Sequence, residues 1–308
     1  NDMIEDRPVT LGTWSPHNYG NKYRGKIPVY TALMVSSNVC AARMIQEVGV
    51  RAVIQTARVL GIETPLEYDY TIALGSNGVK LFEFTRAYGA FANGGFVVQP
   101  YSVERVETSR GKVVYKAPKT KISHQLSMNT AAEMTAMLKT VMSNGTGRAA
   151  NIGKPAAGKT GTTDDNKDAY FVGYTPNIVT GVWVGNDDNT VMSKIVQGGT
   201  VPALIWRDVM KVATEPYGKA EFNYPEVQLI PFAAGSNVKI IGGDDHAEKP
   251  KEEEEKPVNL DDVTAVTPAD VVKNANKKNA EQPVSAPVAP KPAAPAKPAA
   301  APIPSAPA

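Results

Sequence analysis

Several features that would assign a protein to a class are scarce or missing from this sequence. Cys40 is the only cysteine among 308 residues, so no intrachain disulfide can form, and we expect a buried, inert thiol. The three histidines lie far apart without ligand spacing, so we expect neither a metal nor another cofactor. No apolar run is long enough to cross a bilayer, and no signal peptide is visible. A net charge of +2, without a basic stripe rich in aromatic residues, argues against a nucleic-acid partner.

The most informative stretch that is present reads Lys-Thr-Gly-Thr-Thr and begins at Lys159. On a strand, Lys159, Gly161 and Thr163 would share one face, and Thr160 and Thr162 the other. Gly161 has no side chain, so the backbone of a ligand can come close, and the edge of a sheet can accept a peptide as an extra strand. The lysine and the hydroxyls suit a peptide that carries a carboxylate. By itself, however, such a motif is also compatible with a solvated turn.

The sequence after this motif favours a strand over a turn. Two apolar runs at residues 168–174 and 178–185 are separated by Thr175-Pro-Asn177, which has the composition of a turn. We therefore predict a three-stranded antiparallel meander over residues 160–185, with the motif on its first strand.

A second motif, Ser36-Ser-Asn38, lies far upstream between helical patterns at residues 29–35 and 39–48. Its simplest interpretation is a capping turn, because Ser and Asn satisfy the free backbone groups at helix ends. Apolar periodicity predicts further helices at residues 51–60, 81–93, 130–142 and 202–213. Residues 96–107 and 112–117 read as the two strands of a hairpin. Helices followed by an antiparallel meander predict an α/β domain with helices packed on a sheet.

Longer segments connect these two motifs to a known family. They are Trp14-Ser-Pro-His-Asn-Tyr19, Phe82–Gly95, Gly145-Thr-Gly-Arg-Ala-Ala150 and Asp168-Ala-Tyr-Phe-Val-Gly-Tyr174. With Ser36-x-Asn38 and Lys159-Thr-Gly161, they resemble the transpeptidase domain of class A penicillin-binding proteins over roughly residues 4–215. The resemblance implies an antiparallel sheet flanked by helices, the fold shared with serine β-lactamases. It also implies a D,D-transpeptidase that cross-links peptidoglycan stem peptides and is acylated by β-lactams.

The resemblance also implies roles for individual residues. Ser36 would relay protons between an attacking serine and the leaving amine, and Lys159 would assist that relay and attract the substrate carboxylate. The backbone N–H of Thr162 would form half of an oxyanion hole. The implied substrate-binding residues are Asn38, Thr160, Gly161 and Thr162.

One motif of the family, Ser-x-x-Lys, does not occur where it should. It carries the nucleophile and precedes Ser-x-Asn, but none of the 35 residues before Ser36 forms it. Ser109–Lys112 reads as a hairpin turn and Ser236–Lys239 follows the signature, so neither offers the helical spacing that the chemistry needs. We therefore expect the C-terminal part of a longer enzyme. The resemblance implies that this enzyme is membrane-anchored and extracytoplasmic and has a glycosyltransferase domain. This chain alone is predicted to be inactive.

The composition divides the chain into three parts. We predict a transpeptidase domain that lacks its N-terminal part at residues 1–215, and an uncertain extension at 216–243 with a short strand near 227–231. Residues 244–308 are acidic and then rich in proline, which makes up nine of the last 26 residues, and alanine. Such a tail cannot bury enough apolar surface to fold, so it should be a solvated spacer or an arm that docks other cell-wall proteins.

Two other functions remain open at this point. A serine β-lactamase would need a deacylating glutamate between the two motifs, for which Glu63, Glu67 and Glu83 are the available residues. A non-catalytic module could retain the groove and bind stem peptides without a nucleophile.

Overall fold

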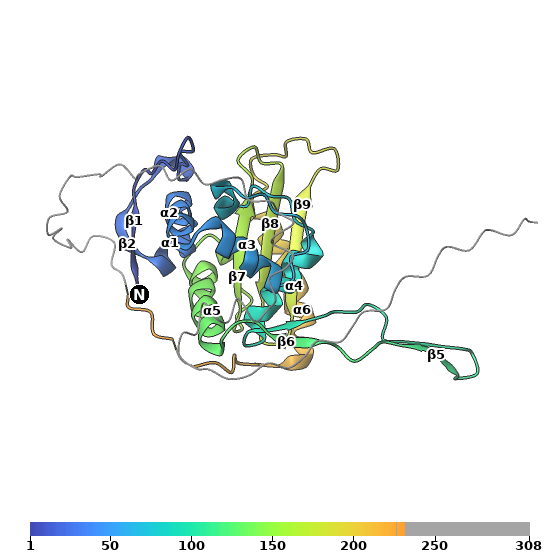
Figure 1. The fold of residues 1–308 in the computed structure, drawn as a ribbon. Helices are drawn as coiled ribbons and strands as arrows, with labels where there is room; N and C mark the ends of the chain where they lie inside the picture. Colours follow the sequence, from blue (N-terminus) through green and yellow to red (C-terminus); the bar gives the residue numbers. More distant parts are fainter. Residues whose placement is uncertain (226, 232–308) are drawn as a thin grey trace, which may run out of the picture. The chain divides into compact units, whose positions relative to one another are not determined.

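The computed structural model describes residues 1–225 and 227–231 (Figure 1). Its helices are α1 (Val29–Val35), α2 (Asn38–Val48), α3 (Val50–Val59), α4 (Leu81–Ala92), α5 (Met128–Ser143) and α6 (Val201–Ala213). Its strands are β1 (Met3–Asp6), β2 (Gly25–Pro28), β3 (Phe96–Val98), β4 (Arg105–Glu107), β5 (Val113–Lys116), β6 (Ile122–His124), β7 (Ala157–Thr162), β8 (Asp168–Tyr174) and β9 (Val179–Gly185). The predictions for residues 232–308, including Ser236–Lys239 and the tail, lie outside the described residues.

The centre of the fold is the antiparallel sheet β7-β8-β9, with the motif strand β7 at one side. Lys159 pairs with Val172 across β7 and β8, and the turn to β9 closes with a 2.9 Å bond from Thr175 N to Ile178 O. This confirms the predicted meander, although β7 begins three residues earlier than expected, at Ala157.

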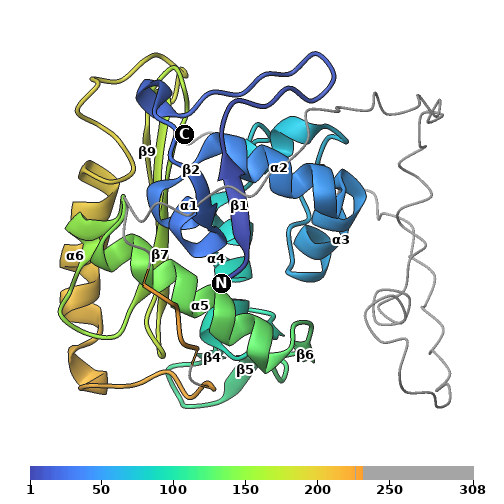
Figure 2. The same cartoon turned by 90° about the vertical axis from the view of Figure 1, so that its left-hand side faces the viewer.

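Helices cover both faces of this sheet, as Figure 2 shows for α6 on one side and α5 on the other. On the α6 face, Phe171 packs against the buried indole of Trp206 with ring centroids 5.2 Å apart. On the opposite face, the buried hydroxyl of Tyr174 bonds to Thr135 of α5 at 2.9 Å. The alternation of side chains along β8 therefore builds two cores, which confirms the predicted fold of an antiparallel sheet flanked by helices.

The hairpin prediction was right at its turn and wrong in its first strand. β4 pairs with β5, and Thr108 N donates to Lys112 O at 2.9 Å, so Ser109–Lys112 does form the turn. Residues 96–107, however, are not one strand. β3 pairs with β6 instead, and the chain leaves the ladder near Pro100, which has no N–H to donate.

Two smaller expectations have clear outcomes. Cys40 is buried, and burial raises the pKa of its thiol to about 11, as expected for an inert cysteine. Residues 227–231 do not form a strand. The side chain of Asn1 holds this segment instead, through Gln228 O at 3.1 Å and Ile230 N at 2.9 Å.

Within the described ranges, no helix is both long and apolar enough to span a membrane.

A buried carboxylate fixes the loop between α3 and α4. Glu83 accepts hydrogen bonds from Thr64 N and Thr64 Oγ1, both at 2.8 Å, and from Glu63 N at 2.9 Å. It also pairs with Lys80 at 3.3 Å. These contacts, with the Thr64 backbone first, lower the pKa of Glu83 from its ordinary 4.5 to about 2.

We expect Glu83→Gln to be less stable than the parent chain at neutral pH, because the amide replaces a charged acceptor of several N–H groups. The folded-state pKa is depressed, so the contribution is present above pH 4.5 and is lost as pH falls toward 2. Denaturant unfolding at several pH values measures this. The difference between the two proteins should shrink across that window, and a difference that is constant with pH would contradict the assignment.

Candidate active site

The Ser36-Ser37-Asn38 turn lies between α1 and α2, and its two serines have different tasks. Ser37 is buried and caps α2, since its Oγ accepts from Cys40 N at 3.2 Å. Ser36 ends α1 in the left-handed region, with φ 57°, and is exposed. The predicted capping turn is therefore correct, and the capping is done by Ser37. This leaves the Ser36 hydroxyl free to point away from the helices.

A buried polar network holds this turn from beneath. The carboxylate of Asp6 accepts from Ser37 Oγ at 2.7 Å and from Asn18 Nδ2 at 2.6 Å. Asn18 Oδ1 in turn accepts from Val39 N at 3.2 Å. Asn38 adds a link from the outer side, where its Nδ2 donates to His17 O at 2.7 Å. The turn is thus fixed by two earlier parts of the chain, Asp6 on β1 and the segment that holds His17 and Asn18.

Lys159 reaches this turn from the sheet. Its Nζ donates to Ser36 Oγ at 2.8 Å and to Thr160 O at 3.0 Å. Burial of the ammonium lowers the pKa of Lys159 from 10.5 to about 8. Roughly one molecule in ten would then carry a neutral amine at pH 7. A lysine in this range can both take up and release a proton near neutral pH, as general acid–base catalysis requires.

The two motif threonines follow Lys159 on the opposite face of β7. Thr160 Oγ1 bonds to Thr146 Oγ1 at 2.7 Å, and Thr162 Oγ1 accepts from Gly198 N at 3.0 Å. A Cβ added at Gly161 would meet only Tyr170 Cβ, at an ordinary 3.5 Å. The structure therefore brings Ser36 and Lys159 together and places the hydroxyls of Thr160 and Thr162 on the opposite face of the same strand.

Sequence reasoning missed the residues that support the motifs. Asn18 and Thr146 lie in segments that carried the family resemblance, and Asp6 lies within its range, but none had a predicted role. Single buried polar residues such as Asp6 and Asn18 do not recur at a regular spacing, so no periodic pattern identifies them in the sequence. The spacing of Ser36 and Asn38 likewise does not reveal that Ser37 faces inward.

The glutamates between the motifs are engaged elsewhere. Glu83 holds the α3–α4 loop, and Glu63 pairs with Arg86 at 3.2 Å. Glu67 lies in the same exposed loop, where its N–H donates to Asn77. These contacts give no support to a deacylating role. Among the described residues, no group of three His, Cys, Asp or Glu side chains could hold a metal ion.

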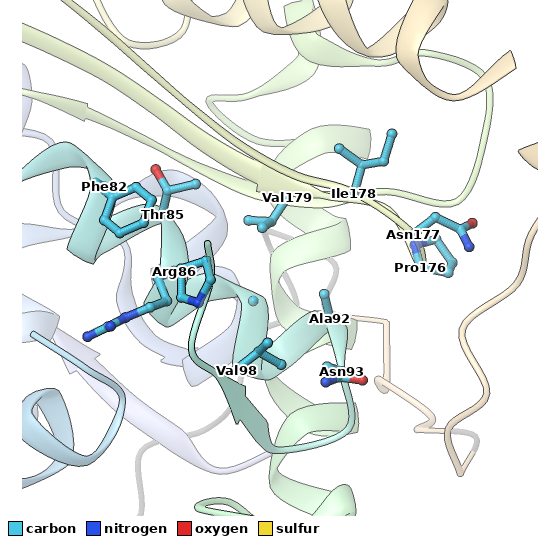
Figure 3. Close-up of a pocket in the computed structure, with 12 residues that line it drawn as sticks. Phe82, Thr85, Arg86, Ala92, Asn93, Val98, Pro176, Asn177, Ile178 and Val179 are labelled. Atoms are coloured by element: carbon cyan, nitrogen blue, oxygen red, sulfur yellow. The ribbon is translucent and has the colours of Figure 1, made fainter. Parts of the chain in front are cut away.

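A hollow lies apart from the two motifs (Figure 3). It has a volume of about 440 Å³ and lies between α4, β3 and the turn that joins β8 to β9. Phe82 and Arg86 come from the helix, and Asn177 and Val179 from the sheet side. None of the six predicted site residues lines it, so size alone does not locate the candidate site.

Comparison with known proteins identifies a domain family. Residues 1–211 match the family model described as the penicillin binding protein transpeptidase domain. Penicillin-binding protein 1A of Aquifex aeolicus is 35% identical over 228 residues, which cover 70% of this chain and 30% of that protein. Penicillin-binding protein 1A of Rickettsia conorii is 30% identical over 273 residues, covering 79% and 33%. The chain thus spans about a third of the length of the curated relatives that it matches.

Solved structures agree on the fold. The crystal structure of penicillin-binding protein 1A from Haemophilus influenzae matches with a TM-score of 0.64 and 26% identity, over 74% of this chain and 40% of that one. PonA1 from Mycobacterium tuberculosis, solved in complex with penicillin V, gives 0.65 and 24%, over 74% and 66%. At that lower identity the likeness is evidence for the fold alone.

Removal of the Asp6 carboxylate should destabilise the chain. Asp6→Ala removes the charged acceptor that Ser37 and Asn18 share and leaves them only the neutral acceptors Asn18 Oδ1 and Lys22 O, so we expect a loss of about 2–4 kcal/mol in the free energy of unfolding. Asp2→Ala is the matched control, because Asp2 is an exposed acid next to the same strand and should change stability by less than about 0.5 kcal/mol. If urea unfolding gave the same loss of unfolding free energy for both variants, the Asp6 network would not stabilise the chain as we expect.

The lowered pKa of Lys159 predicts a rise of stability with pH. Between pH 8 and 10.5 the unfolded chain holds more protons at this lysine than the folded chain, so the free energy of unfolding should increase through that range. Lys159→Met should lose this increase while other groups titrate as before. The check is the difference between the two unfolding curves, and a flat difference would mean that Lys159 titrates normally.

Proposed function

Because this chain belongs to the penicillin-binding protein transpeptidase domain family, we propose that it supplies the second and third motifs of a peptidoglycan D,D-transpeptidase. The observation that carries the proposal is the 2.8 Å contact between Lys159 Nζ and Ser36 Oγ. It joins a residue of the Ser-x-Asn motif to one of the Lys-Thr-Gly motif. A proton can pass directly between the Ser36 hydroxyl and the Lys159 amine at this distance.

In this proposal, a serine outside the chain attacks the carbonyl of the D-Ala–D-Ala bond. The proton of the attacking hydroxyl passes to the leaving amine through the Ser36 hydroxyl, and Lys159 supports each transfer. The terminal D-Ala leaves, and an amine of a neighbouring stem peptide then accepts the acyl group. The pKa of about 8 for Lys159 suits this task, because the amine exchanges protons near neutral pH.

Substrate binding is assigned to the surroundings of β7. The Thr160 and Thr162 hydroxyls and the charge of Lys159 would hold the carboxylate of the stem peptide or of a β-lactam. Gly161 leaves room beside the strand, and the amide of Asn38 would bond to the peptide. The backbone N–H of Thr162 would supply half of the oxyanion hole, and the backbone N–H of the nucleophilic serine would supply the other half.

The same reasoning places this chain within a larger enzyme. We infer that the nucleophile, a membrane anchor and a glycosyltransferase domain belong to sequence outside it, and that the enzyme acts on the outer side of the cytoplasmic membrane. The chain alone then has no residue that a penicillin can acylate at the site.

Labelling with a fluorescent penicillin tests the proposal. We expect no covalent adduct on this chain alone, and a serine adduct in a longer polypeptide whose upstream sequence supplies Ser-x-x-Lys. In that polypeptide, Lys159→Ala should slow acylation about a hundredfold or more, because proton transfer loses its partner.

The control is Lys167→Ala, since Lys167 lies on the turn beyond β7 and pairs with Asp165 at 3.9 Å. This variant should be acylated at the parent rate. A stable adduct on any serine of the chain alone, or an unchanged rate in Lys159→Ala, would overturn the proposal.

A further inference from the structure

We propose that the segment Gly145-Thr146-Gly147 is a clasp that sets the spacing between Ser36 and Lys159, with Gly145 and Thr146 as positioning residues. The segment follows directly on α5, which packs against both α1 and β7. Its importance for catalysis rests on the proposed function, whereas its geometry stands on the contacts alone.

On the helix side, the clasp is bonded to the last turn of α1. Thr146 N donates to Met34 O at 3.2 Å, and Met34 lies two residues before Ser36. A Cβ added at Gly145 would come 2.3 Å from Met34 O and 2.8 Å from Val141 Cα. Both are backbone atoms, so no change of rotamer relieves the contact, and α1 or α5 would have to move. Glycine is needed here for close approach.

On the sheet side, the clasp is bonded to the motif strand. Thr146 Oγ1 lies 2.7 Å from Thr160 Oγ1, next to Lys159 in the chain. The clasp is also covered from outside, since a Cβ at Gly199 would come 2.4 Å from Thr146 O. One at Gly147 would come 3.1 Å from the Phe171 ring beneath the sheet. The segment therefore has little freedom to shift relative to β7 and β8.

These contacts make Thr146 a bridge between the end of α1 and the motif strand β7. Its N–H is bonded to the end of α1 and its hydroxyl to β7, so one residue links the two elements that carry Ser36 and Lys159. An enlarged clasp would push the end of α1 away from the sheet. The Ser36–Lys159 contact would lengthen, and the ammonium of Lys159, which is half-buried, would become more hydrated.

The test is the titration of Lys159 in the full chain labelled with ¹³C-lysine, followed through its Cε signal by NMR and assigned with Lys159→Arg. In Gly145→Ala we expect the pKa of Lys159 to rise from about 8 toward 10.5 by about one unit or more. A rise of one unit is a tenfold decrease in the acid dissociation constant of the ammonium. Gly78→Ala is the matched control, because a Cβ at Gly78 meets no atom within 4 Å. It should leave the titration unchanged.

A second pair of variants keeps the proposal testable where Gly145→Ala fails to fold. Thr146→Val keeps the bulk but loses the bond to Thr160, and should raise the pKa of Lys159 by a smaller amount. Thr146→Ser keeps the hydroxyl and should restore the parent titration. A folded Gly145→Ala or Thr146→Val that titrates as the parent does would overturn the clasp, as would a rise in Gly78→Ala equal to that in Gly145→Ala.

This outcome is separable from that of the proposed function, because the titration needs no reaction. A raised pKa in a chain whose longer form is never acylated would keep the clasp and reject the transpeptidase. If the longer form is acylated but the pKa of Lys159 is unchanged in the clasp variants, the transpeptidase proposal is kept and the clasp is rejected.

Discussion

The site depends on one hydrogen bond, from Lys159 Nζ to Ser36 Oγ, between residues 123 positions apart. Neither element could hold this contact alone. The turn after α1 is fixed from beneath by Asp6 and Asn18, and β7 is fixed by its pairing with β8. Because both partners are anchored independently, a short contact between them can persist without a ligand. Preorganisation of this kind lets a site act without rearrangement at the moment of reaction.

The contact is kept at a cost to stability. Lys159 gives up part of its hydration, which is why its pKa falls to about 8, and Ser36 adopts a left-handed conformation that costs a residue other than glycine about 1–2 kcal/mol. Such local violations are common at functional sites, where the surrounding structure compensates for them. The two strongly packed faces of the sheet, built on Phe171 and Tyr174, provide that compensation here.

The sequence predicted the parts of the fold that have a period or a turn composition. The meander from β7 to β9 followed from two apolar runs on either side of Thr175-Pro-Asn177, and the convergence of Ser36 on Lys159 followed from the family motifs. The pairing of β3 with β6 was missed, because a three-residue strand has too few alternations to show. Asp6 and Thr146 were missed for another reason. Their importance comes from what they touch in space, which no local pattern encodes.

The most direct test of the account is the nuclear Overhauser effect between the β-protons of Ser36 and the ε-protons of Lys159 in the isotopically labelled chain. Oγ and Nζ are 2.8 Å apart and the carbons that carry these protons are each bonded to one of them, so we predict a cross-peak at neutral pH. If the folded chain gives cross-peaks across β7 and β8 but none between Ser36 and Lys159, the two motifs do not share one site.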